Sequence, residues 1–494
     1  MSALQTVREL PQLLHGFATA VPSITVTGLE MDSRRVQAGD LFLACKGSAQ
    51  HGLSYLEQAA DNGASAVAWE PSPGAMPPTQ LPAVAVEQLS VKTGPIAARF
   101  YGEPSRKIFT VGITGTDGKT STAHLIAQAL DQLGLPCAYL GTLGYGRLSA
   151  LGDASHTTPD PVRLQKMLAG FVESGVRAAA MEVSSHALDQ QRVGGMKFDA
   201  AVLTNITRDH LDYHGTVENY ATAKQRLFEF EALGARVLNR DDAYGAAWAG
   251  RYAPDVTVYG VGGAPPAQGR HVLADEVQLK AEGMHFQIRS SWGATALRSR
   301  LLGRFNVYNL LAALTVLLEK GVSLNDAAGA LSESRTVPGR IEGFHGPSAK
   351  PLLVVDYAHT PQALEQILKA VRAHCSGKLW VVFGCGGDRD RGKRPLMGAA
   401  AAQYADVVIV TDDNPRSEKP EAIVAEILGG ITARSSMRVV HNRYEAVRTA
   451  TREAQAGDVV VIAGKGHETT QTYGTDARPF SDRELAAELV GAQG

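Results

Sequence analysis

The chain has 494 residues, with 48 Lys and Arg against 50 Asp and Glu, which gives a formal net charge of −2. This balance argues against a nucleic-acid partner or an anionic membrane surface, so any charged binding site must be local. The length is too great for one hydrophobic core and predicts about three domains. The four cysteines are scattered and form no C-x-x-C pair, which fits a reducing compartment and argues against a disulfide framework.

No signal peptide or membrane span is predicted. The N-terminus carries charged and polar residues early and lacks a long apolar core, unlike a secretory signal. The longest apolar helix candidate, residues 310–318, is far too short to cross a bilayer. We therefore expect a cytoplasmic protein without a membrane partner.

The first segment, residues 1–104, mixes short strands with helices. An Asp-Ser-Arg-Arg run at 32–35 stands near a strand expected at 41–45 and a loop at 46–52. A serine and an arginine beside a glycine turn could bind a phosphate or a sugar. A capped surface turn explains the same residues equally well.

A phosphate cradle is predicted where the second segment begins. An apolar strand at 108–113 runs into a glycine-rich turn, and an amphipathic helix at 121–133 follows. The N–H groups of such a turn and the positive end of the helix would hold phosphate oxygens, Lys119 would reach the outer phosphates, and the Thr120 hydroxyl would hold Mg²⁺. Ile113 stands where the full P-loop pattern has glycine, but the strand-turn-helix context favours nucleotide binding over an ordinary turn. The cradle comprises Gly115, Thr116, Asp117, Gly118, Lys119, Thr120 and Ser121.

The second segment continues as an α/β domain to residue 338. Apolar runs at 178–183 and 200–204 are typical of buried strands, and the helical stretches between them predict a parallel sheet. Short alternating runs between 255 and 302 predict a β excursion. A helix at 307–320 then restores the α/β pattern.

Polar side chains that follow the two buried strands are candidate metal ligands. Glu182 ends the first strand, and His210 comes after the second. Mg²⁺ prefers oxygen, so Glu182 is the stronger candidate. The nearby His214 raises the alternative of a zinc site, but no cysteine or further histidine is expected to complete a zinc set. Lys224 lies in a helical stretch, where spacing alone predicts a solvated lysine.

The third segment, residues 339–494, predicts a second, doubly wound domain. Four short apolar strands alternate with helices, and Thr360 followed by Pro361 is a helix start signal. Ligands of such a sheet lie at the carboxyl ends of its strands. All four strand ends are polar and glycine-rich or charged, which predicts a binding crevice. The expected strands are 352–356, 379–383, 407–411 and 459–463, and the runs at their ends are 356–359, 384–389, 412–416 and 464–468.

Taken together, these motifs resemble those of the Mur ligases over essentially the whole chain. The signatures occur in the family's order. The first four are Gly-Thr-x-Gly-Lys-Thr at 115–120, Glu-Val-Ser-Ser-His at 182–186, Asp-His-Leu-Asp-x-His at 209–214 and Ala-Lys-x-x-Leu-Phe at 223–228. The next four are Phe-Asn-Val-Tyr-Asn at 305–309, Pro-Gly-Arg at 338–340, Asp-Tyr-Ala-His-Thr-Pro at 356–361 and Asp-Arg-Asp-Arg-Gly-Lys-Arg at 388–394.

The resemblance implies three α/β domains and a reaction. The domains would be an N-terminal UDP-binding domain at 1–104, a central P-loop ATPase-type domain with a parallel sheet at 105–338, and a C-terminal Rossmann-like, doubly wound domain at 339–494. ATP would phosphorylate the D-glutamyl carboxylate of UDP-N-acetylmuramoyl-L-alanyl-D-glutamate in peptidoglycan precursor synthesis. The amine of meso-diaminopimelate would then attack the acyl phosphate. A monomer that uses ATP and Mg²⁺ is expected.

The resemblance also assigns roles to individual residues. A lysine at the position of Lys224 is N-carbamylated in this family (N6-carboxylysine) and becomes an anion that helps to hold Mg²⁺. The implied metal ligands are Thr120, Glu182, His210 and Lys224, and the implied catalytic residues are Lys119, Lys224, His210 and Lys393. The implied nucleotide-side residues are Asn306, Asn309, Arg340 and Asp356. The implied muramoyl-peptide and uridine contacts are Met31, Ser33, Ser48, Ala49, Gln50, Thr157, Thr158, Ser184, Gln190 and Arg192. The chain departs from the family at Asp117, where asparagine is commoner, and in the makeup of residues 48–50.

The choice of amine depends on the tetrapeptide Asp413-Asn414-Pro415-Arg416. Without the resemblance it is a turn at a strand end with solvated charges. It resembles the signature of the Mur ligases that add meso-diaminopimelate, whose second carboxylate a planar guanidinium can bind with two hydrogen bonds. Arg389, Gly464 and Glu468 would complete this pocket, with Glu468 pairing the distant ammonium.

Two rival functions fit parts of the chain. A folylpolyglutamate-type ligase would share the ATPase and C-terminal domains but lacks a UDP-binding first domain, so the residues before 102 argue against it. A nucleotide-gated binding protein would need neither the metal ligands nor a second crevice.

Overall fold

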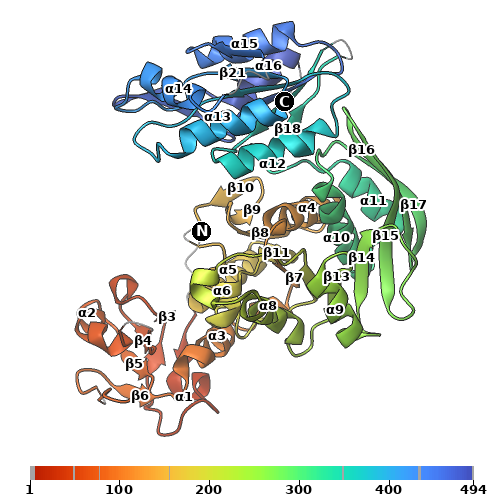
Figure 1. The fold of residues 1–494 in the computed structure, drawn as a ribbon. Helices are drawn as coiled ribbons and strands as arrows, with labels where there is room; N and C mark the ends of the chain where they lie inside the picture. The colour runs from red at the N-terminus through yellow and green to blue at the C-terminus, as the bar shows by residue number, and fades with distance from the viewer. Residues whose placement is uncertain are drawn as a thin grey trace. The chain divides into compact units, whose positions relative to one another are not determined.

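The computed structural model describes residues 6–47, 50–76, 78–154, 156–347, 350–431 and 436–491. The chain divides into two compact units (Figure 1). The first comprises Met1–Tyr259, Pro266–His271 and Thr315–Val322, and the second comprises Gly260–Pro265, Val272–Leu314 and Ser323–Gly494. In the described part of the chain, no helix has both the length and the apolar character that a membrane span requires.

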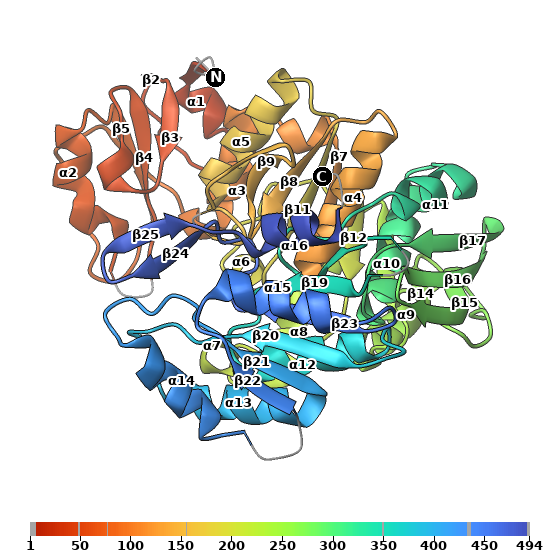
Figure 2. The same cartoon turned by 90° about the horizontal axis from the view of Figure 1, so that it is seen from above.

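The first unit begins with a small parallel sheet of strand order β3-β4-β5-β6. Side chains of β4 alternate between its two faces: Leu41 and Leu43 pack with α1 and α3, whereas Phe42 and Ala44 pack with α2. This period of two is what a strand buried on both faces produces, and Figure 2 shows β3, β4 and β5 next to one another, with α2 on one side of them and α1 and α3 on the other. The bounds are β1 Arg8–Glu9, α1 Leu10–Leu13, β2 Thr25–Val26, β3 Gly28–Glu30, β4 Asp40–Ala44, α2 Leu56–Asp61, β5 Ala66–Trp69, β6 Ala83–Ala85 and α3 Leu89–Phe100.

The remainder of the first unit is built on six parallel strands in the order β8-β11-β7-β12-β13-β14. The predicted parallel sheet is therefore confirmed, and β7 lies at its centre, between β11 and β12. Two short antiparallel strands, β9 and β10, extend the β8 edge and were not predicted. The strands are β7 Phe109–Thr114, β8 Cys137–Gly141, β9 Gly144–Arg147, β10 Ala150–Gly152, β11 Ala178–Glu182, β12 Ala200–Leu203, β13 Ala235–Asn239 and β14 Thr257–Val261. The helices are α4 Lys119–Gln132, α5 Pro161–Glu173, α6 Ser185–Asp189, α7 Leu211–His214, α8 Val217–Gln225 and α9 Ala243–Tyr252.

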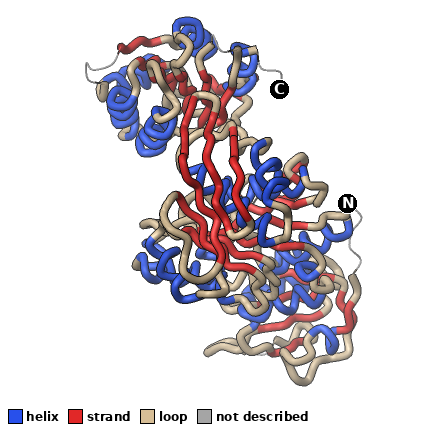
Figure 3. The backbone as a smooth tube through the Cα atoms, turned by 90° about the vertical axis from the view of Figure 1, so that its right-hand side faces the viewer, coloured by secondary structure: helices blue, strands red, loops and turns tan. Residues whose placement is uncertain are grey.

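The second unit contains the predicted β excursion as an antiparallel meander. Strands β15 (Arg270–Lys280), β16 (Gly283–Ser290) and β17 (Gly293–Ser299) pair in sequence, and Figure 3 shows them as three long neighbouring strands. Helices α10 (Phe305–Glu319) and α11 (Leu324–Ser332) follow. The helix expected at 307–320 is thus confirmed.

The C-terminal part of the second unit is a doubly wound sheet of order β18-β19-β23-β20-β21-β22, antiparallel only at β18. Apolar side chains of α12, α13 and α14 pack on one face, and those of α15 and α16 pack on the other. This layering confirms the Rossmann-like prediction. The strands are β18 Glu342–Phe344, β19 Leu352–Asp356, β20 Leu379–Phe383, β21 Val407–Val410, β22 Ser436–Val439 and β23 Val459–Ala463, with a hairpin of β24 Thr470–Tyr473 and β25 Asp476–Pro479. The helices are α12 Pro361–Arg372, α13 Lys393–Tyr404, α14 Pro420–Leu428, α15 Arg443–Glu453 and α16 Asp482–Val490.

Candidate active site

The predicted phosphate cradle joins the central strand β7 to α4. Gly115 (φ +147°) and Gly118 (φ +81°) adopt backbone angles that favour glycine, and α4 begins directly after Gly118, two residues before the predicted start. Lys119 Nζ donates to the backbone oxygens of Gly115 at 2.9 Å and Thr116 at 2.8 Å. Burial lowers the pKa of Lys119, although nearby carboxylates such as Glu182 oppose this shift. The loop thus holds a half-buried lysine at a helix N-terminus, where backbone N–H groups and the helix dipole favour phosphate binding.

Gly115 is expected to be intolerant of any side chain. A Cβ there would lie 1.8 Å from Thr204 Oγ1, on a backbone angle that L-residues rarely adopt. We therefore expect Gly115→Ala to lower the melting temperature by several degrees, since overpacking typically costs about 1–3 kcal/mol. Gly134→Ala is the matched control, because Gly134 also has positive φ (+75°) but a Cβ there would meet no atom within 4 Å. Equal melting temperatures for the two variants in calorimetry would contradict this prediction.

Glu182 ends β11 and is almost fully buried, at 1% exposure. Its Oε2 accepts a hydrogen bond from Thr120 Oγ1 at 2.9 Å, and its Oε1 accepts from Tyr139 Oη at 2.5 Å and from the Thr142 N–H at 2.9 Å. The predicted pair Thr120 and Glu182 is therefore in direct contact. Tyr139 and Thr142 were missed by sequence reasoning, because Tyr139 lies in an apolar strand where nothing indicates a polar role.

Lys224 is buried at 1% exposure, so the prediction from spacing alone, a solvated lysine, is wrong. Its Nζ donates to the Gly115 carbonyl at 2.7 Å and lies 4.4 Å from the centroid of the Tyr220 ring. Burial, followed by the charge of Lys119, lowers the pKa of Lys224 well below its usual range. The side chain is thus biased towards the neutral amine, which is the nucleophilic form.

Three histidines from α6 and α7 lie together: His186 in α6, His210 directly before α7 and His214 at the end of α7. The ring centroid of His186 is 4.8 Å from that of His210 and 5.5 Å from that of His214. His186, which the sequence did not link to the pair, therefore packs against both rings. Burial lowers the pKa of His186 and of His214. Within the described ranges no group of three or more His, Cys, Asp or Glu side chains is arranged to hold a metal.

The residues expected to contact the muramoyl-peptide lie close to Glu182. Thr158 Oγ1 donates to the Glu182 carbonyl at 2.9 Å and accepts from the Ser184 N–H at 3.2 Å. Arg192 donates to the Thr158 carbonyl at 3.2 Å and to Gln190 Oε1 at 2.6 Å. Thr157 Oγ1 is 3.3 Å from Thr142 Oγ1. Polar contacts with one another, with Glu182 or with Thr142 therefore connect all five predicted positions.

A separate cavity of about 460 Å³ lies beside the small N-terminal sheet. Met31, Ser33, Tyr55 and Gln58 contribute to its lining, and Ser33 Oγ donates to Gln58 Oε1 at 2.7 Å. Gln50 Oε1 accepts from Tyr55 Oη at 2.5 Å. The predicted uridine residues Met31 and Ser33 therefore line one cavity, with Gln50 one contact away. Ser48 and Ala49 lie outside the described residues.

In the second unit the predicted nucleotide-side residues form local contacts. Asn309 Nδ2 donates to Asn306 Oδ1 at 2.8 Å, and Asn306 Nδ2 donates to the Leu302 carbonyl at 2.7 Å. Asp356, at the end of β19, accepts from the N–H groups of Ile341 and Ala358. Burial raises the pKa of Asp356, although these hydrogen bonds and the charge of Arg340 oppose the rise.

Lys393, at the start of α13, is held near the same sheet edge. Its Nζ donates to the His359 carbonyl at 2.8 Å, so the start of α13 contacts the predicted strand-end run 356–359. Arg340 is exposed and open to a ligand from solvent.

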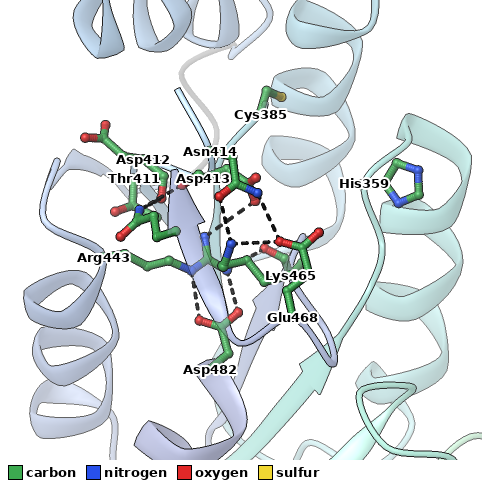
Figure 4. A network of polar contacts seen from close by, with 12 residues as sticks. His359, Cys385, Thr411, Asp412, Asp413, Asn414, Arg443, Lys465, Glu468 and Asp482 are labelled. Carbon is green, nitrogen blue, oxygen red and sulfur yellow. Dashed lines mark hydrogen bonds and ion pairs between the residues drawn. The ribbon is translucent and has the colours of Figure 1, made fainter. Parts of the chain in front are cut away.

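The residues predicted to form the amine pocket lie at the carboxyl ends of β21 and β23, and several of them contact one another (Figure 4). Asn414 Nδ2 donates to Glu468 Oε2 at 3.0 Å. Gly464 has φ +118°, and a Cβ there would lie 2.7 Å from Asp413 Oδ2. The prediction of solvated charges is wrong for Asp413, which is buried together with Asn414 and Pro415. The tetrapeptide is therefore packed into the protein and is no solvated surface turn, whereas the crevice stays a prediction.

Arginines border this pocket. Arg416 has φ +53°, and its NH1 donates to the Gly387 carbonyl at 2.8 Å. Arg389 is exposed. Sequence reasoning missed three buried residues of the pocket: Lys465, Arg443 and Asp482. Lys465 lies in the strand-end run 464–468, whose composition indicated a site. No sequence pattern indicated Arg443 or Asp482.

The glycine loop, with Lys119 at its end and the buried Lys224 against it, together with the doubly wound sheet, defines an α/β protein of the nucleotide-binding class. Three family models match the chain: "Mur ligase family, catalytic domain" at 25–101, "Mur ligase middle domain" at 113–317 and "Mur ligase, glutamate ligase domain" at 339–466. The chain belongs to the Mur ligase family, and it has that family's three-domain α/β fold, with a mixed central sheet and a mostly parallel C-terminal sheet.

Individual relatives agree with the family models. A UDP-N-acetylmuramoyl-L-alanyl-D-glutamate–2,6-diaminopimelate ligase of Coxiella burnetii is 46% identical over 489 residues, 98% of this chain and 99% of that protein. The ligase of the same name from Pseudomonas aeruginosa is 45% identical over 96% of this chain and 97% of that protein. A solved structure of a ligase with this name is 36% identical, with a TM-score of 0.80 and coverage of 98% of this chain and 99% of that one.

Proposed function

We propose that this protein is an ATP-dependent ligase that adds meso-diaminopimelate to UDP-N-acetylmuramoyl-L-alanyl-D-glutamate in peptidoglycan synthesis. The similarity to ligases of that name over nearly the whole chain supports the reaction. The observation that carries the choice of amine is the tetrapeptide 413–416, whose Asn414 contacts Glu468 and whose Arg416 lies close enough for its charge to act on Glu468. A guanidinium there suits the second carboxylate of diaminopimelate, which lysine lacks.

The first unit would bind ATP and present its γ-phosphate to the D-glutamyl carboxylate. Lys119 and the N–H groups at the start of α4 would stabilise the phosphate oxygens, and the resulting acyl phosphate would be open to attack by the amine. The muramoyl-peptide would lie along Thr157, Thr158, Ser184, Gln190 and Arg192, and the uridine in the cavity lined by Met31 and Ser33. Asn306, Asn309, Arg340, Asp356 and Lys393 would act on the nucleotide side.

The residues of the first unit fit Mg²⁺. Thr120 and Glu182 provide oxygen donors in contact with each other, and Mg²⁺ prefers such hard oxygen ligands. Lys224, once carbamylated, would add two further oxygens, and His210 would complete the set. When bound, Mg²⁺ would offset the repulsion between the carboxylate and the γ-phosphate.

Glu182→Gln is expected to raise the Mg²⁺ concentration needed for half-maximal activity about tenfold or more. The amide removes a negative charge and places N–H donors against the donors Thr120, Tyr139 and Thr142. A Mg²⁺ titration of phosphate release from ATP measures this change. An unaltered titration curve with normal turnover would remove Glu182 from the proposed metal site.

We also propose the domain limits 1–104, 105–338 and 339–494, which agree with the ranges of the three family models. The proposed location is the cytoplasm, and the proposed oligomeric state is a monomer.

The function is tested by phosphate release from ATP in the presence of both substrates. Release is expected only when the UDP-muramoyl-dipeptide and meso-diaminopimelate are present together, with the UDP-muramoyl-tripeptide detected by mass spectrometry. Equal turnover with L-lysine would contradict the choice of amine, and phosphate release without a new amide product would contradict the ligase reaction itself.

A further inference from the structure

The amine pocket contains a lysine that none of the roles above uses. Lys465 lies directly after Gly464, and its side chain has 0% exposure. Its Nζ donates to Asn414 Oδ1 at 3.1 Å and to Glu468 Oε2 at 2.8 Å. Because Asn414 Nδ2 also donates to that Glu468 oxygen at 3.0 Å, the three side chains form a closed triangle (Figure 4).

The cations and carboxylates around this site are equal in number. Arg443 and Asp482, both with 0% side-chain exposure, form a pair with contacts of 2.7 and 2.8 Å. Arg443 NH1 has no hydrogen-bond partner among the described residues and lies 4.0 Å from Asp413 Oδ2. Three cations, Arg443, Lys465 and Arg416, thus stand against the three carboxylates of Asp413, Glu468 and Asp482, and the charge of Arg416 acts on Glu468 as well. Without Lys465 one carboxylate would be left uncompensated.

Glu468 is the side chain to which the proposed function assigns the distant ammonium of the amino acid. Its side chain is 31% exposed, so a ligand can reach it. Burial acts to raise the pKa of Glu468, but hydrogen bonds from Lys465 and Asn414 outweigh burial and leave the pKa lowered. Glu468 is therefore ionised at neutral pH, and the charge that it presents to a ligand is partly offset by Lys465 from behind.

We propose that Lys465 is a positioning residue that sets amine selectivity by offsetting the charge of Glu468. This inference rests on the proposed function. meso-Diaminopimelate carries two ammonium groups and two carboxylates, so its net charge is zero, whereas L-lysine lacks one carboxylate and is a net cation. Each uncompensated carboxylate in the pocket favours lysine, and a buried cation behind Glu468 removes that advantage.

The test compares the ratio of kcat/KM for meso-diaminopimelate to that for L-lysine. In Lys465→Met, which removes the charge but keeps the length, the ratio is expected to fall about tenfold, mainly through a lower KM for lysine. The double variant Lys465→Met/Glu468→Gln removes one charge of each sign, so its ratio is expected to return to within about twofold of the starting value. If Lys465 served only to stabilise the fold, adding Glu468→Gln would not restore the ratio.

Two further outcomes separate this inference from the proposed function. If the parent protein turns over diaminopimelate and Lys465→Met leaves the ratio unchanged, the inference is overturned while the function stands. If the parent protein shows no diaminopimelate-dependent turnover, the proposed function fails instead. Should Lys465→Met not fold, Lys465→Arg keeps the charge and is expected to keep the ratio, and a tenfold fall in that variant would overturn the inference.

Discussion

Replacing Lys224 by alanine is expected to lower kcat about 100- to 1000-fold, the range seen when one preorganised electrostatic group is lost. The side chain is buried against Tyr220 and donates to the Gly115 carbonyl of the phosphate loop. A carbamate at this place would supply an anion to the metal site, and alanine cannot form it. Incubation with ¹³C-bicarbonate followed by NMR is expected to show a carbamate signal in the parent protein and none in Lys224→Ala.

The pH dependence of this signal follows from the pKa of Lys224. Burial and the charge of Lys119 lower that pKa, so more neutral amine is available near neutral pH than an exposed lysine would provide. As the pH falls through the lowered pKa, the amine becomes protonated, and the carbamate and the activity are expected to decline together; both are retained as the pH rises. Full activity of Lys224→Ala, or a carbamate signal that survives in it, would exclude this role. Lys320→Ala is the control, since Lys320 lies over the ring of Phe109 and has no proposed role in the reaction.

Much of the fold could be predicted because short stretches of the sequence indicate its strands and helices. The strands at 352–356, 379–383 and 459–463 have the predicted bounds, since short β-branched runs between polar strand ends are clear strand signals. Parallel strands bring their carboxyl ends to one edge, which is why Asn414 and Glu468 could be expected together. The antiparallel β9 and β10 are short and rich in glycine, so no periodicity indicates them.

The environment of single side chains could not be predicted in the same way. Lys224 contacts Gly115, 109 residues away in sequence, and Lys465 contacts Asn414, 51 residues away. Both lysines are buried by partners that only the tertiary fold supplies. The assignment of Lys224 therefore depended on family resemblance, and Lys465 was not assigned at all.

Arg416→Ala is expected to lower kcat/KM for meso-diaminopimelate about 30-fold or more, because losing one partner of a buried charge pair typically costs about 2–5 kcal/mol. The arginine is well placed for this role. Its N–H donates to the Thr472 carbonyl at 3.1 Å, its carbonyl accepts from the Gly474 N–H at 2.7 Å, and its NH1 is held by Gly387 at 2.8 Å. A guanidinium held in this way loses little entropy when it binds a carboxylate.

For L-lysine, Arg416→Ala is expected to lower kcat/KM only slightly, because lysine has no second carboxylate that the variant would leave unpaired. Arg416→Lys keeps the charge without the planar fork and is expected to give an intermediate value for diaminopimelate. Arg478→Ala is the matched control, because Arg478 lies on the neighbouring β25, is exposed and forms its ion pair with Asp476 of the same strand. Steady-state kinetics with each amine measures these changes. Equal falls in kcat/KM for lysine and diaminopimelate would mean that Arg416 supports the loop and does not distinguish the two amines.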